Sequence, residues 1–205
     1  MPLPTTPILF YKPATSLSTP TSPILIPELA QHPPGLDYEC ELVIVIGKDG
    51  RDIPASDALG YVLGYSVGND VSHRHLQLQS GGGQWSLGKG FDTWAPWGPG
   101  IVSAEAIKDP QGLRIETVVN GEVRQKSSTA DMIFSVKETV AFLSKGTTLR
   151  QGDLIFTGTP EGVAMGGEKG KERWLKDGDL VEVRLEGVGT CRNVVKFEGA
   201  GQPKL

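Results

Sequence analysis

The sequence has no apolar run approaching the ~20 residues that a helix needs to cross a bilayer, so no membrane-spanning segment is expected. The first residues lack both a basic stretch and an apolar core, and no secretory signal is predicted. There are only two cysteines, Cys40 and Cys191, too few for a disulfide framework and without zinc-site spacing. We therefore predict a cytoplasmic protein without membrane contact, with both thiols reduced and buried.

The chain also lacks any run of basic residues. Its 20 Lys and Arg are scattered among 24 Asp and Glu, giving a formal net charge of −4. A nucleic-acid-binding protein would show a basic stripe, so no nucleic-acid partner is predicted. The apolar fraction of 38% in 205 residues supports a packed core. With 27 Gly and 15 Pro, the composition favours turns and short strands over a helical bundle.

Proline is concentrated near the start of the chain. Nine of the 15 prolines fall between Pro2 and Pro34, a density that excludes helix and leaves few donors for strand pairing. We predict that residues 1–35 form a partly extended segment on the surface, with short strands at Ile8–Tyr11 and Ile24–Ile26. Residues 36–205 are expected to form the ordered domain, so that the chain is one domain overall.

The pattern beyond residue 36 predicts a mainly β fold with few short helices, of the α+β class. Tyr38–Ile46 ends in a continuous β-branched run, as expected of a strand buried on both faces. Asn120-Gly121 predicts a two-residue hairpin turn. The clearest helix is 135–144, with Ser135 at its N-cap and Glu138 three residues later. Other strands are expected at 65–70, 97–103, 113–120, 122–128, 154–157, 180–185 and 191–197, and shorter helical turns at 56–64 and 71–79.

Glu39 and Glu41 are the first residues that suggest chemistry. Residues two apart in a strand point to the same face, so both carboxylates converge while Cys40 faces the other way, into the core. Two close carboxylates repel each other unless a cation or a proton intervenes, and Mg²⁺ is a cation that carboxylate oxygens hold well. The alternative is a pair of solvated glutamates on an edge strand.

A second group follows the strand predicted at 65–70. Asp70 ends that strand beside glycine, which suits a metal ligand, although a turn or a helix cap would also place an Asp there. On a helical turn, Asp70, Arg74 and Gln77 fall on one side. An Arg and a Gln near a metal suit a substrate carboxylate; the alternative is a local Asp–Arg surface pair.

Two further residues stand in glycine-rich surroundings. Lys89 lies between glycines in G-K-G-F-D-T-W, either in a site or on a solvated loop. Thr159, in T-G-T-P-E-G-V, offers a hydroxyl and a backbone N–H that suit an anionic oxygen, or it is part of an ordinary turn.

Four segments in this order and spacing closely resemble the fumarylacetoacetate hydrolase superfamily, over roughly Pro7 to Phe197. They are D-Y-E-C-E-L-V-I-V-I-G-K (37–48), G-Y-S-V-G-N-D-V-S-H-R-H-L-Q (64–77), Q-W-S-L-G-K-G-F-D-T-W-A-P-W-G-P (84–99) and Q-G-D-L-I-F-T-G-T-P-E-G-V (151–163). The resemblance implies a mixed β-sandwich roll, with 36–205 as the catalytic domain, and usually a homodimer.

The resemblance also implies roles for the candidate residues. Glu39, Glu41 and Asp70 match the family's metal-binding carboxylates, which hold Mg²⁺ or Mn²⁺. Four more match positions that bind the oxo-acid end of the substrate: Arg74, Gln77, Lys89 and Thr159. Relatives cleave C–C bonds of acylpyruvates and fumarylacetoacetate-like compounds, decarboxylate oxaloacetate, or isomerise related dioxo-acids. A metal chelated by a 2-oxo-carboxylate stabilises the enolate that forms as the C–C bond breaks.

The sequence departs from the family pattern upstream. Most relatives carry a preceding element with a His and a Glu that activate water, and we find no counterpart here. His32, with Glu28 nearby, is a substitute base or an exposed loop residue, and with Lys89 it completes the candidate catalytic set. His75 stands where many relatives have Asp.

We predict a divalent-metal-dependent hydrolase or decarboxylase acting on a small β-keto or 2,4-dioxo acid. The alternatives are an isomerase or decarboxylase of a specialised pathway with a larger substrate, and a non-catalytic member that binds a metal.

Overall fold

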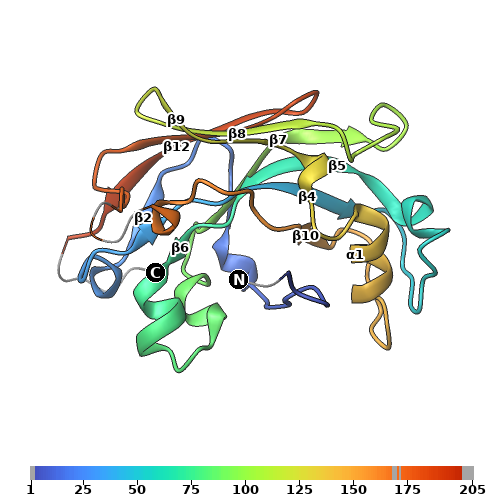
Figure 1. The fold of residues 1–205 in the computed structure, drawn as a ribbon, viewed down its shortest axis with the longest axis horizontal. Helices are drawn as coiled ribbons and strands as arrows, with labels where there is room; N and C mark the ends of the chain where they lie inside the picture. Colours follow the sequence, from blue (N-terminus) through green and yellow to red (C-terminus); the bar gives the residue numbers. More distant parts are fainter. Residues whose placement is uncertain (1–2, 168–169, 171, 200–205) are drawn as a thin grey trace.

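The computed structural model describes residues 3–167, 170 and 172–199, and every structural statement below concerns these residues. Two five-stranded sheets lie one over the other, and their facing strands pack together to form the core (Figure 1). A third, two-stranded sheet and a few short helices lie around them. The predicted mainly β fold with few helices is therefore confirmed.

The first sheet carries the segment predicted to be buried on both faces. Its strand order is β1-β7-β5-β4-β10, and every residue of the interior strand β4 is buried. Only β1 pairs in parallel, with β7; the other pairings are antiparallel. The strands are β1 (Leu17–Ser18), β4 (Cys40–Ile46), β5 (Val62–Asn69), β7 (Ala95–Ser103) and β10 (Leu154–Phe156).

The second sheet packs over the first and has the order β2-β12-β11-β8-β9. The hairpin predicted at Asn120-Gly121 joins β8 to β9, and both residues have positive φ, 52° and 81°, as a type I′ turn requires. The strands are β2 (Ile24–Ile26), β8 (Arg114–Val119), β9 (Glu122–Ser128), β11 (Leu180–Leu185) and β12 (Gly189–Phe197).

The proline-rich segment contributes to both sheets. β1 adds an edge to the first sheet and β2 adds one to the second, which confirms the strand expected at Ile24–Ile26. The strand expected at Ile8–Tyr11 is wrong: Ile8, Leu9 and Tyr11 are exposed, and the described residues supply no ladder partner for this segment. A short run of β-formers pairs only where a sheet edge is within reach.

The helix predicted at 135–144 is confirmed as α1 (Val136–Leu143). Ser135 and Glu138 form the capping box, and Val136 and Val140 are fully buried. The helical structure predicted at 56–64 is confirmed only as a single 3-10 turn, η3 (Ala58–Tyr61). The rest of the prediction is wrong, because β5 already begins at Val62. The other short helices are η1 (Ala14–Ser16), η2 (Glu28–Ala30), η4 (Leu76–Ser80), η5 (Trp85–Gly88), η6 (Thr129–Asp131) and η7 (Ala164–Gly166).

The two-stranded sheet corrects the prediction for 71–79. β3 (Leu36–Asp37) pairs with β6 (Ser72–His73), so helical structure starts only after this bridge and ends in the π-helical turn η4. Cys40 and Cys191 are buried free thiols, as predicted, and burial raises the pKa of Cys191 to about 12. Within the described part of the chain, no helix has the length and apolar character to cross a membrane.

Candidate metal centre

Three carboxylates meet where β4 begins and β5 ends. The antiparallel register pairs Cys40 with Asn69, so Glu39 and Asp70 lie at the same edge, and the Asp70 N–H donates to the Glu39 carbonyl at 2.9 Å. Glu39, Glu41 and Asp70 each offer an oxygen within 4.8 Å of the others, and all three side chains are buried. Cys40 points to the opposite face, with its sulfur 3.8 Å from the Arg184 carbonyl, as the alternation predicts.

Burial makes it unfavourable for all three carboxylates of this cluster to carry a negative charge. The pKa of Glu41 is raised well above its usual range, first by burial and then by repulsion from Asp70 and Glu39. A backbone N–H, that of Gly158, donates to Glu41 Oε2 at 2.7 Å. Burial alone would also raise the pKa of Asp70, but the positive charges of Lys12 and Lys89 outweigh it and lower that pKa. The cluster therefore favours an additional positive charge beside Glu41.

Lys89 lies inside the cluster rather than on a solvated loop. Its side chain is 1% exposed, and Nζ donates to Glu39 Oε2 at 2.9 Å, Asp70 Oδ2 at 2.7 Å and Ser72 Oγ at 2.6 Å. Burial disfavours the charge, but Asp70 and Glu39 more than compensate and raise the pKa of Lys89. The ammonium group is thus held protonated, as a donor at the centre of the site.

Arg74 and Gln77 contact each other, as expected, but the prediction that Asp70 shares a helix face with them is wrong. The Arg74 guanidinium donates from Nη1 to Gln77 Oε1 at 2.9 Å and from Nε to Asp37 Oδ2 at 2.8 Å, and its Nη2 is 2.6 Å from Glu39 Oε1. β6 separates Asp70 from the helical turn, so Asp70 does not share a helix face with Arg74. The alternative of a local Asp70–Arg74 surface pair is excluded, because both side chains are buried with other partners.

Thr159 lies beside the cluster, but its hydroxyl is engaged by the fold. The hydroxyl donates to the Cys40 carbonyl at 3.0 Å and accepts from Gln125 Nε2 at 2.8 Å. A threonine hydroxyl has a single proton, so an anion at this position would have to use the backbone N–H of Thr159.

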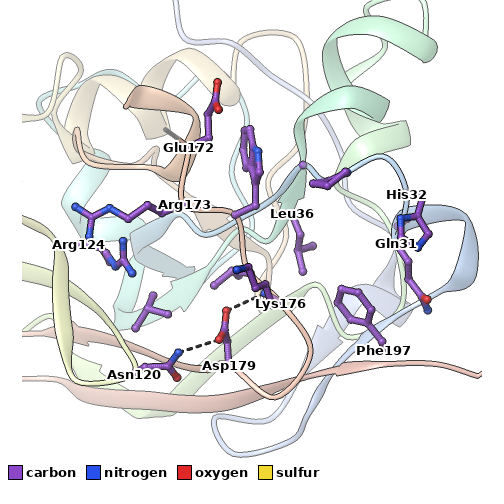
Figure 2. Close-up of a pocket in the computed structure, with 16 residues that line it drawn as sticks. Gln31, His32, Leu36, Asn120, Arg124, Glu172, Arg173, Lys176, Asp179 and Phe197 are labelled. Carbon is purple, nitrogen blue, oxygen red and sulfur yellow. Dashed lines mark hydrogen bonds between the residues drawn. The ribbon is translucent and has the colours of Figure 1, made fainter. Parts of the chain in front are cut away.

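The structure does not bring a histidine to the three acids. His32 is exposed and lines a cavity of about 600 Å³ whose wall includes none of the three carboxylates. Figure 2 shows His32 beside Gln31, at the opposite end of that cavity from Arg124. His73 is buried, with Nε2 3.1 Å from the Pro33 carbonyl, and His75 Nδ1 is 2.8 Å from Gln79 Oε1.

Sequence reasoning missed two charged residues, Lys12 and Asp37. Lys12 Nζ donates to Asp70 Oδ1 at 2.5 Å and to the Trp94 carbonyl at 2.9 Å, and burial is the main reason that its pKa is lowered. Asp37 is fully buried and holds Arg74. The available signals were that Lys12 is the only lysine in residues 1–35 and that Asp37 begins the D-Y-E-C-E motif.

The charges of the site almost balance. Four carboxylates meet three cationic side chains, and every one of them is buried or nearly so. The acids are Asp37, Glu39, Glu41 and Asp70, and the cations are Lys12, Arg74 and Lys89. A divalent cation together with an anionic ligand would add little net charge to this dry interior.

Comparison with known families and proteins gives consistent matches. A family model described as fumarylacetoacetate (FAA) hydrolase C-terminal matches residues 1–196. An uncharacterized protein of Archaeoglobus fulgidus is 47% identical over 193 residues, which are 94% of this chain and 70% of that protein. The Xenopus laevis protein named oxaloacetate tautomerase fahd2, mitochondrial, is 43% identical over 195 residues, which are 95% of this chain and 60% of that protein.

Solved structures match over the same extent. A fumarylacetoacetate hydrolase from Exiguobacterium antarcticum has a TM-score of 0.86 at 42% identity, covering 93% of this chain and 66% of that one. A 2-hydroxyhepta-2,4-diene-1,7-dioate isomerase from Mycobacterium marinum has a TM-score of 0.84 at 42% identity, covering 96% of this chain and 71% of that one. This chain thus spans roughly two thirds of the length of the proteins that it resembles.

Proposed function

Because the chain belongs to the fumarylacetoacetate hydrolase family, a family of enzymes, we propose that it is a divalent-metal-dependent enzyme that activates a small oxo-acid for cleavage of a carbon–carbon bond. The observation that carries the proposal is the meeting of Glu39, Glu41 and Asp70, buried and within 4.8 Å of one another. Hydrolysis and decarboxylation are the two cleavage reactions that we propose.

The donor set fits a hard cation such as Mg²⁺ or Mn²⁺. Carboxylate oxygens are the ligands that these ions prefer, and all three candidate ligands are carboxylates. The raised pKa of Glu41 supports the fit, since a cation would relieve the repulsion that Asp70 and Glu39 exert on it. A cation held there would supply Lewis-acid polarisation of the keto group of a bound oxo-acid.

Arg74 and Gln77 are proposed to hold the substrate carboxylate. A guanidinium has five N–H bonds, and three nitrogens of Arg74 are engaged through one contact each, to Asp37, Glu39 and Gln77. Nη1 and Nη2 therefore each keep a second N–H for a ligand. Since Gln77 accepts from Arg74 through Oε1, its NH₂ group is also directed away from Arg74 and adds further donors.

Lys89 is proposed to stabilise, through its positive charge, the substrate oxygen on which negative charge develops. Its three N–H bonds are already directed at Glu39, Asp70 and Ser72, so the group is fixed in place. A positive charge fixed in a dry site stabilises developing negative charge without reorganising, which is the main way that such groups accelerate reactions. Lys12, on the other oxygen of Asp70, balances the charge of that carboxylate.

A second candidate function is keto–enol tautomerisation of a small oxo-acid. The Xenopus relative is named an oxaloacetate tautomerase and the Mycobacterium marinum structure is that of an isomerase. Moving a proton between carbon and oxygen requires no activated water and breaks no C–C bond. This agrees with a site that holds the ammonium groups of Lys12 and Lys89, whereas His32, His73 and His75 lie against other groups.

One experiment separates the candidates. The protein is incubated with oxaloacetate and with acetylpyruvate, with added Mg²⁺ or with EDTA, while NMR follows keto and enol forms and a coupled assay follows released pyruvate. Metal-dependent pyruvate release supports cleavage, and interconversion of keto and enol forms without pyruvate supports tautomerisation. Equal rates with and without EDTA would refute the metal proposal, and absence of both reactions leaves a non-catalytic member.

A homodimer and a cytoplasmic location stay predictions; the Xenopus relative is named as mitochondrial.

A further inference from the structure

Asp37 is the most deeply buried acid of the site and has no oxygen among the candidate metal ligands. It ends β3, is 0% exposed, and accepts from four donors. Oδ1 accepts from the backbone N–H groups of Tyr38 and Ala164, at 2.8 and 2.7 Å. Oδ2 accepts from Arg74 Nε at 2.8 Å and from the backbone N–H of Met165 at 3.1 Å.

The two oxygens therefore serve different segments of the chain. Oδ1 fixes the local turn at Tyr38 and the start of η7, 127 residues away. Oδ2 joins the next residue of η7 to the Nε edge of Arg74. The Arg74 guanidinium also contacts Glu39 through Nη2 and Gln77 through Nη1, so Asp37 Oδ2 is one of three acceptors that orient it and the one that holds its Nε edge.

The geometry points to Asp37 as a positioning residue that fixes both Arg74 and the η7 turn in the arrangement that binds the carboxylate of the substrate. This inference rests on the proposed function, in which Arg74 holds that carboxylate. A guanidinium turns about its long side chain unless an acceptor fixes its plane, and a fixed plane is what allows two parallel hydrogen bonds to a carboxylate. Asp37 supplies that acceptor from a position where neither substrate nor metal touches it.

Asp37→Asn removes the negative charge that Arg74 faces and leaves one acceptor oxygen for four donors. In either orientation of the amide, its NH₂ group faces two N–H donors, so one of the two pairs of contacts is lost and Arg74 Nε loses its charged partner. Loss of a charge-assisted hydrogen bond in a buried site weakens ligand binding by about tenfold or more. The three metal ligands keep their charges and places.

The test uses the full chain loaded with Mg²⁺ and oxalate as the probe, measured by calorimetry. We expect Asp37→Asn to weaken oxalate binding by about tenfold, with Mg²⁺ affinity within about twofold of wild type. In the Arg74→Lys background, which lacks Nε, Asp37→Asn should have no further effect. Hydrogen exchange should quicken at the amide of Ala164 or of Met165, whichever the new NH₂ group faces.

The control is Asp179→Asn, which alters a half-buried carboxylate that accepts from the Lys176 N–H and from Asn120 Nδ2 in a turn elsewhere. It should leave oxalate binding unchanged. Unchanged oxalate affinity in Asp37→Asn, a parallel loss of Mg²⁺ affinity, or additive effects with Arg74→Lys would each overturn the inference. If Asp37→Asn does not fold, Asp37→Glu decides, because it keeps the charge and displaces the carboxylate: it must weaken oxalate binding and spare Mg²⁺ binding. A wild type that binds no oxalate refutes the proposed function instead, which is a different result.

Discussion

The ammonium group of Lys12 donates to Oδ1 of Asp70 at 2.5 Å, across 58 residues of sequence. The other oxygen of Asp70 accepts from Lys89 at 2.7 Å, so one candidate metal ligand is held between two lysines. The proline-rich segment thereby contributes a charge to the centre of the molecule. The two lysines already balance part of the negative charge that would attract a metal cation. Removing Lys12 should therefore change the affinity of the site for a metal.

Lys12→Met should tighten Mg²⁺ binding while weakening the metal-free fold. Removing the cation leaves Asp70 with Lys89 alone, so the attraction for Mg²⁺ rises, by several-fold to about tenfold. Breaking one side of a buried ion pair typically costs about 3 to 5 kcal/mol, so the melting temperature in EDTA should fall. Calorimetry and thermal melts with and without Mg²⁺ measure both effects. Lys137→Met, at an exposed position of α1, is the control; weaker Mg²⁺ binding in Lys12→Met would contradict the prediction.

Glu41→Gln should abolish the thermal stabilisation by Mg²⁺ without weakening the metal-free protein. The raised pKa of Glu41 means that its charged form is disfavoured in the fold, so a neutral isostere removes a cost at neutral pH. The amide oxygen can still accept from Gly158. Melting temperatures in EDTA and in Mg²⁺ are compared, with the exposed Glu105→Gln as control. A Mg²⁺-dependent shift as large as that of wild type would show that Glu41 is not a ligand.

His73 should make the fold acid-sensitive. Burial lowers the pKa of His73 below the usual 6.5, so the unfolded chain binds a proton more readily than the folded one. Stability from this group is present above pH ~6.5 and falls as the pH drops from there toward the lower folded pKa. In His73→Gln, the free energy of unfolding should change less between pH 7.5 and pH 5.5 than in wild type, although it starts lower. Exposed His32→Gln should keep the wild-type slope, and an unchanged slope in His73→Gln would refute the assignment.

Gly88→Ala should disturb the position of Lys89. A Cβ at residue 88 would lie 2.5 Å from the backbone nitrogen of Gln77. Because this atom belongs to the backbone, no side-chain rotation can relieve the clash. η5 would have to move away from η4, at a cost of about 1 to 3 kcal/mol. Denaturant unfolding measures the loss, and Mg²⁺ affinity should change with it because Lys89 contacts Glu39 and Asp70. Gly60→Ala has open space around its Cβ and serves as the matched control. Equal stabilities of the two variants would show that the close approach is not maintained.

Much of the fold could be predicted because the signals are local. The capping box at Ser135 and Glu138, the turn at Asn120-Gly121 and the buried run of β4 each depend on residues adjacent in sequence. Three predictions that failed concern segments whose structure depends on whether a distant strand edge is near: the strand at Ile8–Tyr11, the longer helix at 56–64 and the helical start at residue 71. Local propensity does not contain that information.

The sequence by itself determined that Glu39 and Glu41 project to one face while Cys40 points away, because the two-residue period of a strand is a property of the backbone. Only the tertiary structure decided which groups meet those acids. Asp70 is placed by the β4–β5 register, and Lys12 by a segment whose lysine also donates to the Trp94 carbonyl. Asp37 connects Arg74 to η7, 127 residues further along the chain. Contacts between distant residues depend on the pairing and packing of whole strands, which the spacing of residues does not record.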